Sequence, residues 1–144
     1  MIREIYENDF YAWTENQVTL LRGGQLAGLD LEHIAEELES MGRSERRELE
    51  SRLEVLVMHL LKWRYQPQRR GTSWYHTIVV QRARVLRVLE DNPSLRPRTK
   101  GLLDVVYPTA RLLAAGETGI EHLPEVCPFT LNQVLDTHYW PESI

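Results

Sequence analysis

The chain has 144 residues, of which 42% are hydrophobic and 26% charged, and its formal net charge is −4. This length predicts one domain, and the composition excludes disordered, collagen-like and disulfide-stapled chains. No apolar run is long enough to span a membrane, and the first ten residues lack the apolar stretch of a signal peptide. The single cysteine, Cys127, cannot form an internal disulfide. We therefore expect a cytoplasmic protein with no membrane contact.

Charge is distributed unevenly along the chain. Residues 1–42 contain 2 basic and 9 acidic groups, residues 43–98 contain 13 and 6, and residues 99–144 contain 2 and 6. Arginine supplies 15 of the 17 basic groups. Its planar guanidinium pairs with carboxylates and phosphates and stacks on aromatic rings. The basic middle segment therefore either pairs with the acidic flanks within the chain or binds an anionic partner.

The apolar spacing is helical almost throughout. Asp9 can cap a first helix that runs to about Arg22 and ends at two glycines. Its expected buried residues are Phe10, Trp13, Val18 and Leu21. Asp30 can cap the next helix, which Gly42 either ends or weakens. The expected buried face of that helix contains Leu31, Ile34, Leu38 and Met41.

Residues 44–65 have the clearest helical stripe, formed by Leu49, Leu53, Leu56, Leu60 and Trp63. Pro67 is expected to stop this helix. The following turn leads to a helix over residues 74–91, capped by Ser73. Ile78, Val85 and Leu89 lie near the centre of that helix, with Gln81, Arg82, Arg84 and Arg87 largely opposite them.

A further helix is predicted from Asn92 and Pro93 to about Ala115, with a stop at Gly116. Pro108 is expected either to kink this helix or to divide it into two shorter ones. Residues 117–129 look irregular. Thr130 and Gln133 have the spacing of a capping box, which predicts a short last helix. The resulting fold class is all-α: a single-domain antiparallel bundle of five to six helices over residues 1–144, with a loop-rich C-terminal segment.

Four segments of the chain are distinctive: DFYAW (9–13), the run from LDLEHIAEELESMGRSERR to WRYQPQRRGTSW (29–74), SLRPR (94–98) and CPFTLNQVLD (127–136). Together they resemble one bacterial family of unknown function, the domain-of-unknown-function family twenty-nine (DUF29). The resemblance spans nearly the whole chain and implies a small helical protein with no assigned activity. It carries no catalytic residues over to this sequence. Pro108 departs from the helical residues expected there.

Catalytic and metal-binding patterns are weak in this sequence. Cys127 precedes a proline in a loop, with no helix start after it to lower its pKa, so we interpret it as an incidental thiol. The chain has no phosphate-binding loop, dinucleotide fingerprint or zinc-finger spacing. The only candidate metal ligands are His33 and Glu37, which share a helix face, and His59. We expect no cofactor and assign no catalytic residue, and the sequence leaves open whether the chain is an enzyme.

One cluster combines arginines with aromatic residues where the third and fourth helices meet. It contains Trp63, Arg64, Tyr65, Arg69, Arg70, Trp74 and Tyr75. Such a cluster can bind an acidic peptide or stack bases. Alternatively, the tryptophans close the core and the arginines extend over them. A second group, Arg43, Arg46 and Arg47, either belongs to the same binding surface or pairs with Glu39, Glu50 or the acidic first segment.

Three functions remain open from the sequence. The leading hypothesis is a non-enzymatic interaction module that presents the arginines and tryptophans, among them Arg69, Arg70, Trp63 and Trp74, to an acidic protein partner. Nucleic-acid binding by the same face is the alternative, disfavoured by the negative net charge. A metal-dependent enzyme in the bundle interior is the third. A homodimer is possible under each of them.

Overall fold

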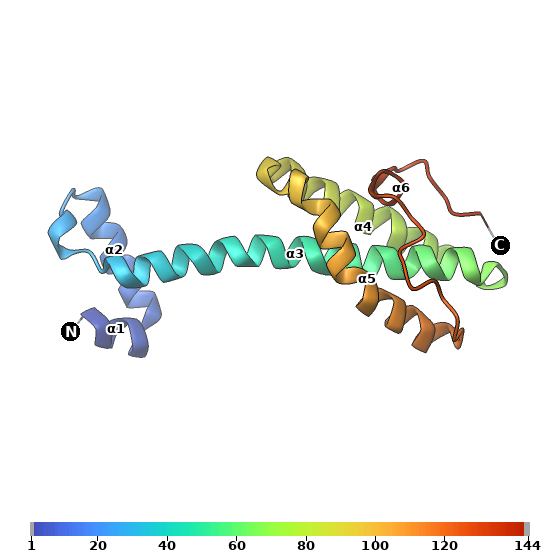
Figure 1. Ribbon diagram of the computed structural model, residues 1–144. Helices are drawn as coiled ribbons and strands as arrows, with labels where there is room; N and C mark the ends of the chain where they lie inside the picture. Colours follow the sequence, from blue (N-terminus) through green and yellow to red (C-terminus); the bar gives the residue numbers. More distant parts are fainter. Residues whose placement is uncertain (1, 143–144) are drawn as a thin grey trace. The chain divides into compact units, whose positions relative to one another are not determined.

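The computed structural model describes residues 2–142 of the chain, and the side chains of residues 5–142 (Figure 1). With the 3₁₀ turns counted, 79% of the described residues are helical and none of them lies in a strand, so the predicted all-α class is confirmed. The helices are α1 (Ile2–Asn8), α2 (Phe10–Arg22), α3 (Leu31–Tyr65), α4 (Thr72–Asp91), α5 (Arg96–Thr118) and α6 (Leu131–Leu135). Short 3₁₀ turns cover Leu26–Gly28, Pro67–Arg69 and Pro93–Leu95.

The chain forms two compact units, Met1–Ser44 and Glu45–Ile144. Helix α3 contributes its first turns to the first unit and the remainder to the second. Folding of the whole chain as one domain, as its length suggests, stays a prediction.

The first unit is held together by an aromatic cluster and a polar network. The ring of Tyr6 lies 4.8 Å from that of Trp13 and 3.9 Å from that of His33. The Trp13 indole donates to the Asp30 carboxylate at 3.0 Å, and the Gln17 side chain accepts from the Asp30 amide at 2.8 Å. The Asp30 carboxylate also accepts from the His33 amide at 3.4 Å, which confirms its predicted role as a cap.

Most of the burial predicted for the first unit is wrong. Trp13 is buried, but Phe10, Val18 and Leu21 are 43–49% exposed. Leu31, Leu38 and Met41 are also exposed, at 62–68%. Periodicity identifies the apolar side of a helix, but burial also requires an element to cover that side. Helix α1, which the apolar spacing did not predict, packs on α2, and none of the described elements covers these side chains.

The second unit contains the main hydrophobic core, and here the predicted stripe is confirmed. Leu49, Leu53, Leu56 and Leu60 of α3 are fully buried. Ile78, Val85 and Leu89 of α4 and Leu103, Val106 and Ala110 of α5 pack in the same cluster. Each fully buried leucine stabilises the fold by about 1.5–3 kcal/mol relative to an exposed one. Because the α3 leucines pack in one cluster with side chains of α4 and α5, they hold these three helices together.

The structure decides between the two alternatives left open at Gly42 and corrects the predicted cap at Ser73. Helix α3 continues through Gly42, because a glycine there costs only about 1 kcal/mol and the long helix tolerates it. Helix α4 begins at Thr72 with an extended Gly71 as its N-cap, so Ser73 lies inside the helix and is not the cap. The stop before Pro67 is confirmed, since α3 ends at Tyr65.

Helix α5 begins and ends about three residues later than predicted. It begins at Arg96, after the turn that Pro93 opens, and it continues through Pro108 and Gly116 to Thr118. The buried residues Val106, Tyr107, Ala110 and Ala114 lie on both sides of Pro108, so packing offsets its missing amide donor. The left-handed Gly119, with φ of 76°, follows the helix.

The last helix confirms the predicted capping box. The Thr130 hydroxyl accepts from the Gln133 amide at 3.1 Å, and the Gln133 side chain accepts from the Thr130 amide at 3.0 Å. Val134 docks α6 into the core as a fully buried side chain. From Gly119 to Thr130 the chain has no helix, which matches most of the irregular segment predicted there.

Candidate functional site

The predicted arginine–aromatic cluster lies at the turn between α3 and α4. Trp63 ends the α3 stripe, Trp74 lies in the first turn of α4, and both indoles are half-buried. The Lys62 ammonium lies 4.8 Å from the centre of the Trp74 ring. Arg69 is exposed, and no ion pair to it occurs among the described residues. The cluster therefore exists as a local group, but much of it contacts the protein itself.

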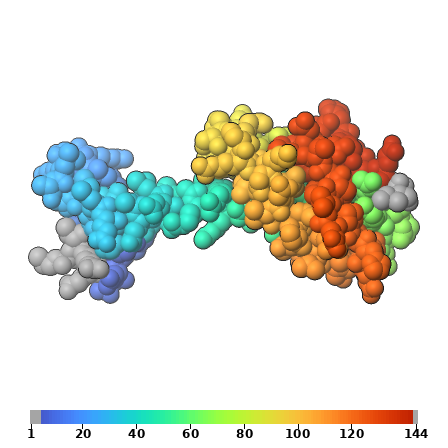
Figure 2. All heavy atoms as spheres, in the orientation of Figure 1, coloured from blue at the N-terminus to red at the C-terminus, as the bar shows by residue number. Residues whose placement is uncertain are grey.

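The aromatic part of this cluster is covered by a segment that the sequence analysis did not connect with it. The Trp140 ring is stacked on that of Tyr75, with centres 5.0 Å apart and planes at 8°. It also lies 4.8 Å from the Trp63 ring. Figures 1 and 2 both show the red segment around residues 136–142 near the green turn that follows α3. No local sequence signal could have paired Trp140 with residues more than sixty positions away.

Arg70 is engaged within the chain. Its Nε donates to the Trp63 carbonyl at 2.6 Å and its Nη2 to the Pro141 carbonyl at 3.3 Å. Its guanidinium carbon lies 5.1 Å from the centre of the Trp63 ring. Arg70 thus joins the end of α3 to the segment that contains Trp140. Binding of a partner by Arg69, Arg70, Trp63 and Trp74 stays a prediction.

Arg82 contradicts its predicted place on the polar side of α4, because it is only 1% exposed. Its Nε donates to the Val134 carbonyl at 2.9 Å and its Nη2 to the Gln133 carbonyl at 3.1 Å. The guanidinium also lies 5.5 Å from the centre of the Trp140 ring. Burial lowers the pKa of Arg82, and nearby Asp136 partly opposes that shift. The side chain binds α6, which local periodicity could not reveal.

The predicted arginine group of α3 lies on the helix surface. Arg43 pairs with Glu39 at 3.8 Å and Arg46 with Glu50 at 3.7 Å, each across one helical turn. Arg47 is exposed and makes no ion pair with a described residue. Surface pairs of this kind contribute about 0.3–0.5 kcal/mol. The arrangement matches internal pairing for two of the three arginines.

The candidate metal ligands of the first unit are occupied by local partners. His33 Nδ1 lies 2.7 Å from the Asp30 carboxylate, and Glu37 accepts from the Tyr6 hydroxyl at 2.5 Å. That hydrogen bond, together with burial, raises the pKa of Tyr6 to about 12. Burial raises the pKa of Asp30, but hydrogen bonds from His33 and Trp13 outweigh it, so this pKa is below its ordinary value.

The other two candidate groups are in the second unit. His59 Nδ1 donates to the Val55 carbonyl at 2.8 Å, and burial lowers the pKa of the ring. Burial also raises the pKa of the Cys127 thiol, which is the opposite of what a reactive cysteine requires. Within the residues that the structure describes, no three histidine, cysteine or carboxylate side chains come together as a metal site.

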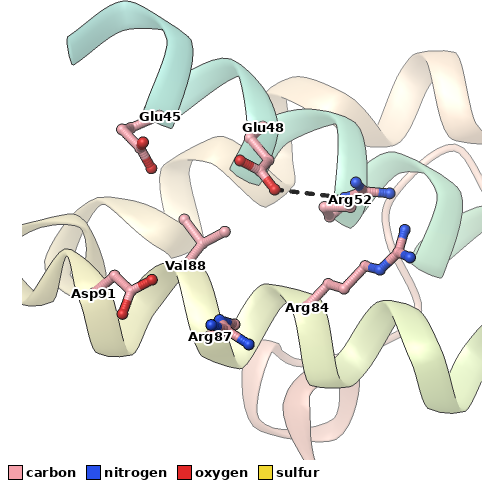
Figure 3. A pocket seen from close by; sticks show the side chains of 7 residues that line it. All are labelled: Glu45, Glu48, Arg52, Arg84, Arg87, Val88 and Asp91. Carbon is pink, nitrogen blue, oxygen red and sulfur yellow. Dashed lines mark ion pairs between the residues drawn. The ribbon is translucent and has the colours of Figure 1, made fainter. Parts of the chain in front are cut away.

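A groove between α3 and α4 brings together charged residues that the sequence analysis treated separately. Its volume is about 350 Å³, and Arg52 of α3 lies opposite Arg84 of α4, with Arg87 further along α4 towards Asp91 (Figure 3). Figure 3 shows Arg52 and Arg84 at one end of the groove and the carboxylates of Glu45 and Asp91 at the other. Glu48 and the apolar Val88 complete the lining. The groove is therefore charged in opposite senses at its two ends.

Few of these charges neutralise one another directly. Arg52 lies 3.9 Å from Glu48, at the outer limit of an ion pair, and Glu45 accepts from the Asn92 amide at 3.1 Å. Arg84 and Arg87 have no carboxylate within 4 Å in the described part of the chain. Their spacing of three residues on α4 explains why they project on the same side. Two exposed guanidinium groups are thus free to bind an anion.

Comparison with known proteins supplies a family. The family model described as "Domain of unknown function DUF29" matches residues 5–140. The chain belongs to the DUF29 family. This confirms the resemblance drawn from the sequence motifs, and the family name assigns no activity to the groove or the cluster. No curated protein and no solved structure matches this DUF29 chain. Among the described residues, every helix is too short or too polar to cross a lipid bilayer.

Proposed function

We propose that this DUF29 chain is a non-enzymatic interaction module that binds an acidic segment of a protein partner through Arg52, Arg84 and Arg87. The observation that supports this proposal is the exposed pair of guanidiniums on α4, which face Arg52 across the groove with only one loose ion pair. Guanidinium groups bind carboxylates in a planar, two-bond geometry. A partner helix or loop with two or three carboxylates fits this end of the groove.

The groove supports this role better than the face around Trp63 and Trp74. Arg70 is engaged there with the Trp63 and Pro141 carbonyls, and Trp140 packs against the Trp63 ring. The α4 arginines have no such internal partners among the described residues. An exposed charge steers a partner and fixes its register at low desolvation cost.

The chemistry of the groove also favours a protein over a nucleic acid. Glu45, Glu48 and Asp91 line the same groove as the arginines. A continuous phosphate backbone along the groove would meet these carboxylates, whereas a protein segment can place acidic residues at one end and basic residues at the other. The net charge of −4 further disfavours binding to an anionic polymer.

The test compares two charge-reversed variants of equal net charge. Arg84→Glu with Arg87→Glu changes the groove, and Arg96→Glu with Arg98→Glu changes exposed residues at the start of α5. Anisotropy of a fluorescein-labelled helical peptide with Glu on one face measures binding. We expect the groove variant to bind about tenfold or more weakly, a loss of at least 1.4 kcal/mol, and the α5 variant to bind nearly as the natural chain does.

Equal losses in both variants, or no binding by the natural chain, would contradict the proposal. A labelled 20-base-pair DNA duplex tests the alternative in the same assay. Three arginine–phosphate contacts would give a slope of log affinity against log salt of about −2.7. If DNA binds more tightly than the peptide and with this salt dependence, the assay supports nucleic-acid binding and contradicts the proposal.

A further inference from the structure

The segment of residues 136–142, here called the strap, lies on a cradle built from α3, α4 and the turn between them. The cradle consists of Trp63, Arg70, Tyr75 and Arg82. Three of these residues contact the Trp140 ring of the strap, and Arg70 binds the carbonyl of the following proline at 3.3 Å. The contact therefore combines an aromatic ring with the backbone carbonyl of the residue that follows it.

The strap is held by its side chains rather than by regular structure. It contains no helix or strand in its described residues, and its local hydrogen bonds join Tyr139 and His138 to Asp136. Pro141 is buried, whereas His138 is 94% exposed at its side chain. Because the Trp140 ring contacts three of the four cradle residues, Trp140 is the principal anchor of the strap.

The cradle also matches the charge of the strap. Arg70 and Arg82 are the cationic members of the cradle, while Asp136 and Glu142 are the carboxylates of the strap. Burial lowers the pKa of Arg82, and the charge of Asp136 opposes this shift only in part. Nη1 of Arg82 has no hydrogen-bond partner among the described atoms, so the cradle retains a buried donor. An extended acidic segment with a central aromatic residue fits this environment.

We propose that the cradle is a peptide-binding site for an extended partner segment that contains an aromatic residue, then proline, then a carboxylate, and that the strap occupies this site as an intramolecular competitor. The proposal goes beyond the α3–α4 groove, because it uses different residues and a different recognition chemistry. Rings of the cradle select the aromatic residue, Arg70 selects the carbonyl after it, and the two arginines favour an acidic segment.

Because the strap belongs to the same chain as the cradle, its binding predicts how the cradle behaves towards a free peptide in solution. A tethered segment acts at an effective concentration in the millimolar range, so a free peptide at micromolar concentration cannot displace it. Loss of the Trp140 anchor removes the competitor while leaving the four cradle residues in place. The Trp140→Ala chain should therefore bind a peptide that the natural chain excludes.

The test uses a fluorescein-labelled peptide with the sequence of residues 137–142, Thr-His-Tyr-Trp-Pro-Glu. We expect saturable binding to the full chain with Trp140→Ala, at least about tenfold tighter than to the natural chain. His138→Ala is the matched control, because it changes an exposed strap residue and leaves Trp140 seated. A peptide with alanine in place of its tryptophan should not bind any of the three chains.

Three results would overturn the proposal. One is a Trp140→Ala chain with natural helix content that does not bind the peptide, because the strap would then serve the core alone. Another is binding of the alanine peptide with equal affinity. The third is a doubled mass of the natural chain in light scattering that Trp140→Ala abolishes, because the occupant would then be the strap of a second copy.

If Trp140→Ala fails to fold, hydrogen exchange on the natural chain tests whether the strap can leave the cradle. The Tyr139 amide donates to Asp136 at 3.1 Å within the strap. A free energy of opening for this amide that is lower than that of the core amides would support a displaceable strap. Exchange of that amide only together with the α3 core amides would overturn the proposal.

Discussion

The Arg82 guanidinium is almost completely buried between α4, α6 and the Trp140 ring. Taking a charge out of water is costly, and within the described residues no carboxylate lies within 4 Å to offset that cost. The offset comes from the Val134 and Gln133 carbonyls near the end of α6, which lack helical partners of their own. Arg82 thus caps a five-residue helix that could not be stable alone.

Replacement of this residue by methionine should destabilise the second unit. Arg82→Met keeps most of the apolar stem but leaves two carbonyl acceptors without their donor, which costs about 1–3 kcal/mol for each poorly solvated group. We expect the free energy of unfolding in urea to fall by about 2 kcal/mol or more. Arg84→Met, at an exposed position of the same helix, should change it by about 0.5 kcal/mol or less. Equal effects would show that the guanidinium does not hold α6.

His59 gives the second unit a pH dependence. Its pKa in the folded chain is below the ordinary value of 6.5, first because of burial and then because of the nearby Lys62, while the Val55 carbonyl and Glu117 oppose the shift. The unfolded chain therefore binds a proton more readily, so stability present above pH 6.5 is lost as the pH falls below it.

The loss is measurable by comparing urea midpoints at pH 7.5 and pH 5.5. We expect the natural chain to lose more stability between these values than His59→Gln, whose side chain does not titrate. A His59→Gln chain with the same pH dependence as the natural one would show that the ring is not the titrating group.

At the scale of the elements, α3 carries two different surfaces along 35 residues. From Leu49 onward its leucines are fully buried by α4 and α5, whereas residues 38–48 are all exposed. An acidic Glu32 in the first turn and basic Lys62 and Arg64 in the last turn suit the helix dipole. The helix therefore depends on tertiary packing at one end and on local interactions elsewhere.

Truncation of leucines should distinguish these surfaces. Leu53→Ala removes a fully buried side chain and should cost about 2–5 kcal/mol of unfolding free energy. Leu38→Ala removes a side chain that is 62% exposed and should cost about 0.5 kcal/mol or less. Denaturation in urea at constant protein concentration provides both values. A large loss in Leu38→Ala would mean that this leucine is covered in solution.

At the scale of the whole molecule, the two units differ in how they are stabilised. In the first unit the described buried side chains are Trp13, Gln17 and His33, supported by the Tyr6 and Asp30 contacts. The second unit has a large aliphatic core around α3, α4 and α5. Burial of apolar area is the dominant stabilising term, so the first unit should open more easily.

Hydrogen exchange should reveal this difference directly. We expect amides of α2 to exchange through an opening with a lower free energy than amides of residues 53–61 in α3. Tyr6→Phe, which removes the hydrogen bond to Glu37, should increase exchange in α2 without changing the α3 core. Exchange of both groups with the same free energy would mean that the chain unfolds as one cooperative domain.

The features that the sequence alone determined are local ones. The caps at Asp9, Asp30 and Thr130 and the stop at Pro67 depend on residues three or four positions apart, or on a proline ring. The leucine stripe of α3 follows from helical periodicity. The continuous run of leucines on one side of the helix predicted a buried core, and these leucines are buried. The DUF29 motifs likewise lie in the sequence itself.

Only the tertiary structure decided which side chains meet across long separations. Arg82 reaches carbonyls 51 and 52 residues away, and Arg70 reaches one 71 residues away. The groove of Arg52, Arg84 and Arg87 depends on how α3 packs on α4. Leu38 and Met41 are exposed because no described element packs over them. Periodicity describes one helix at a time, whereas burial and binding sites arise from the packing of several.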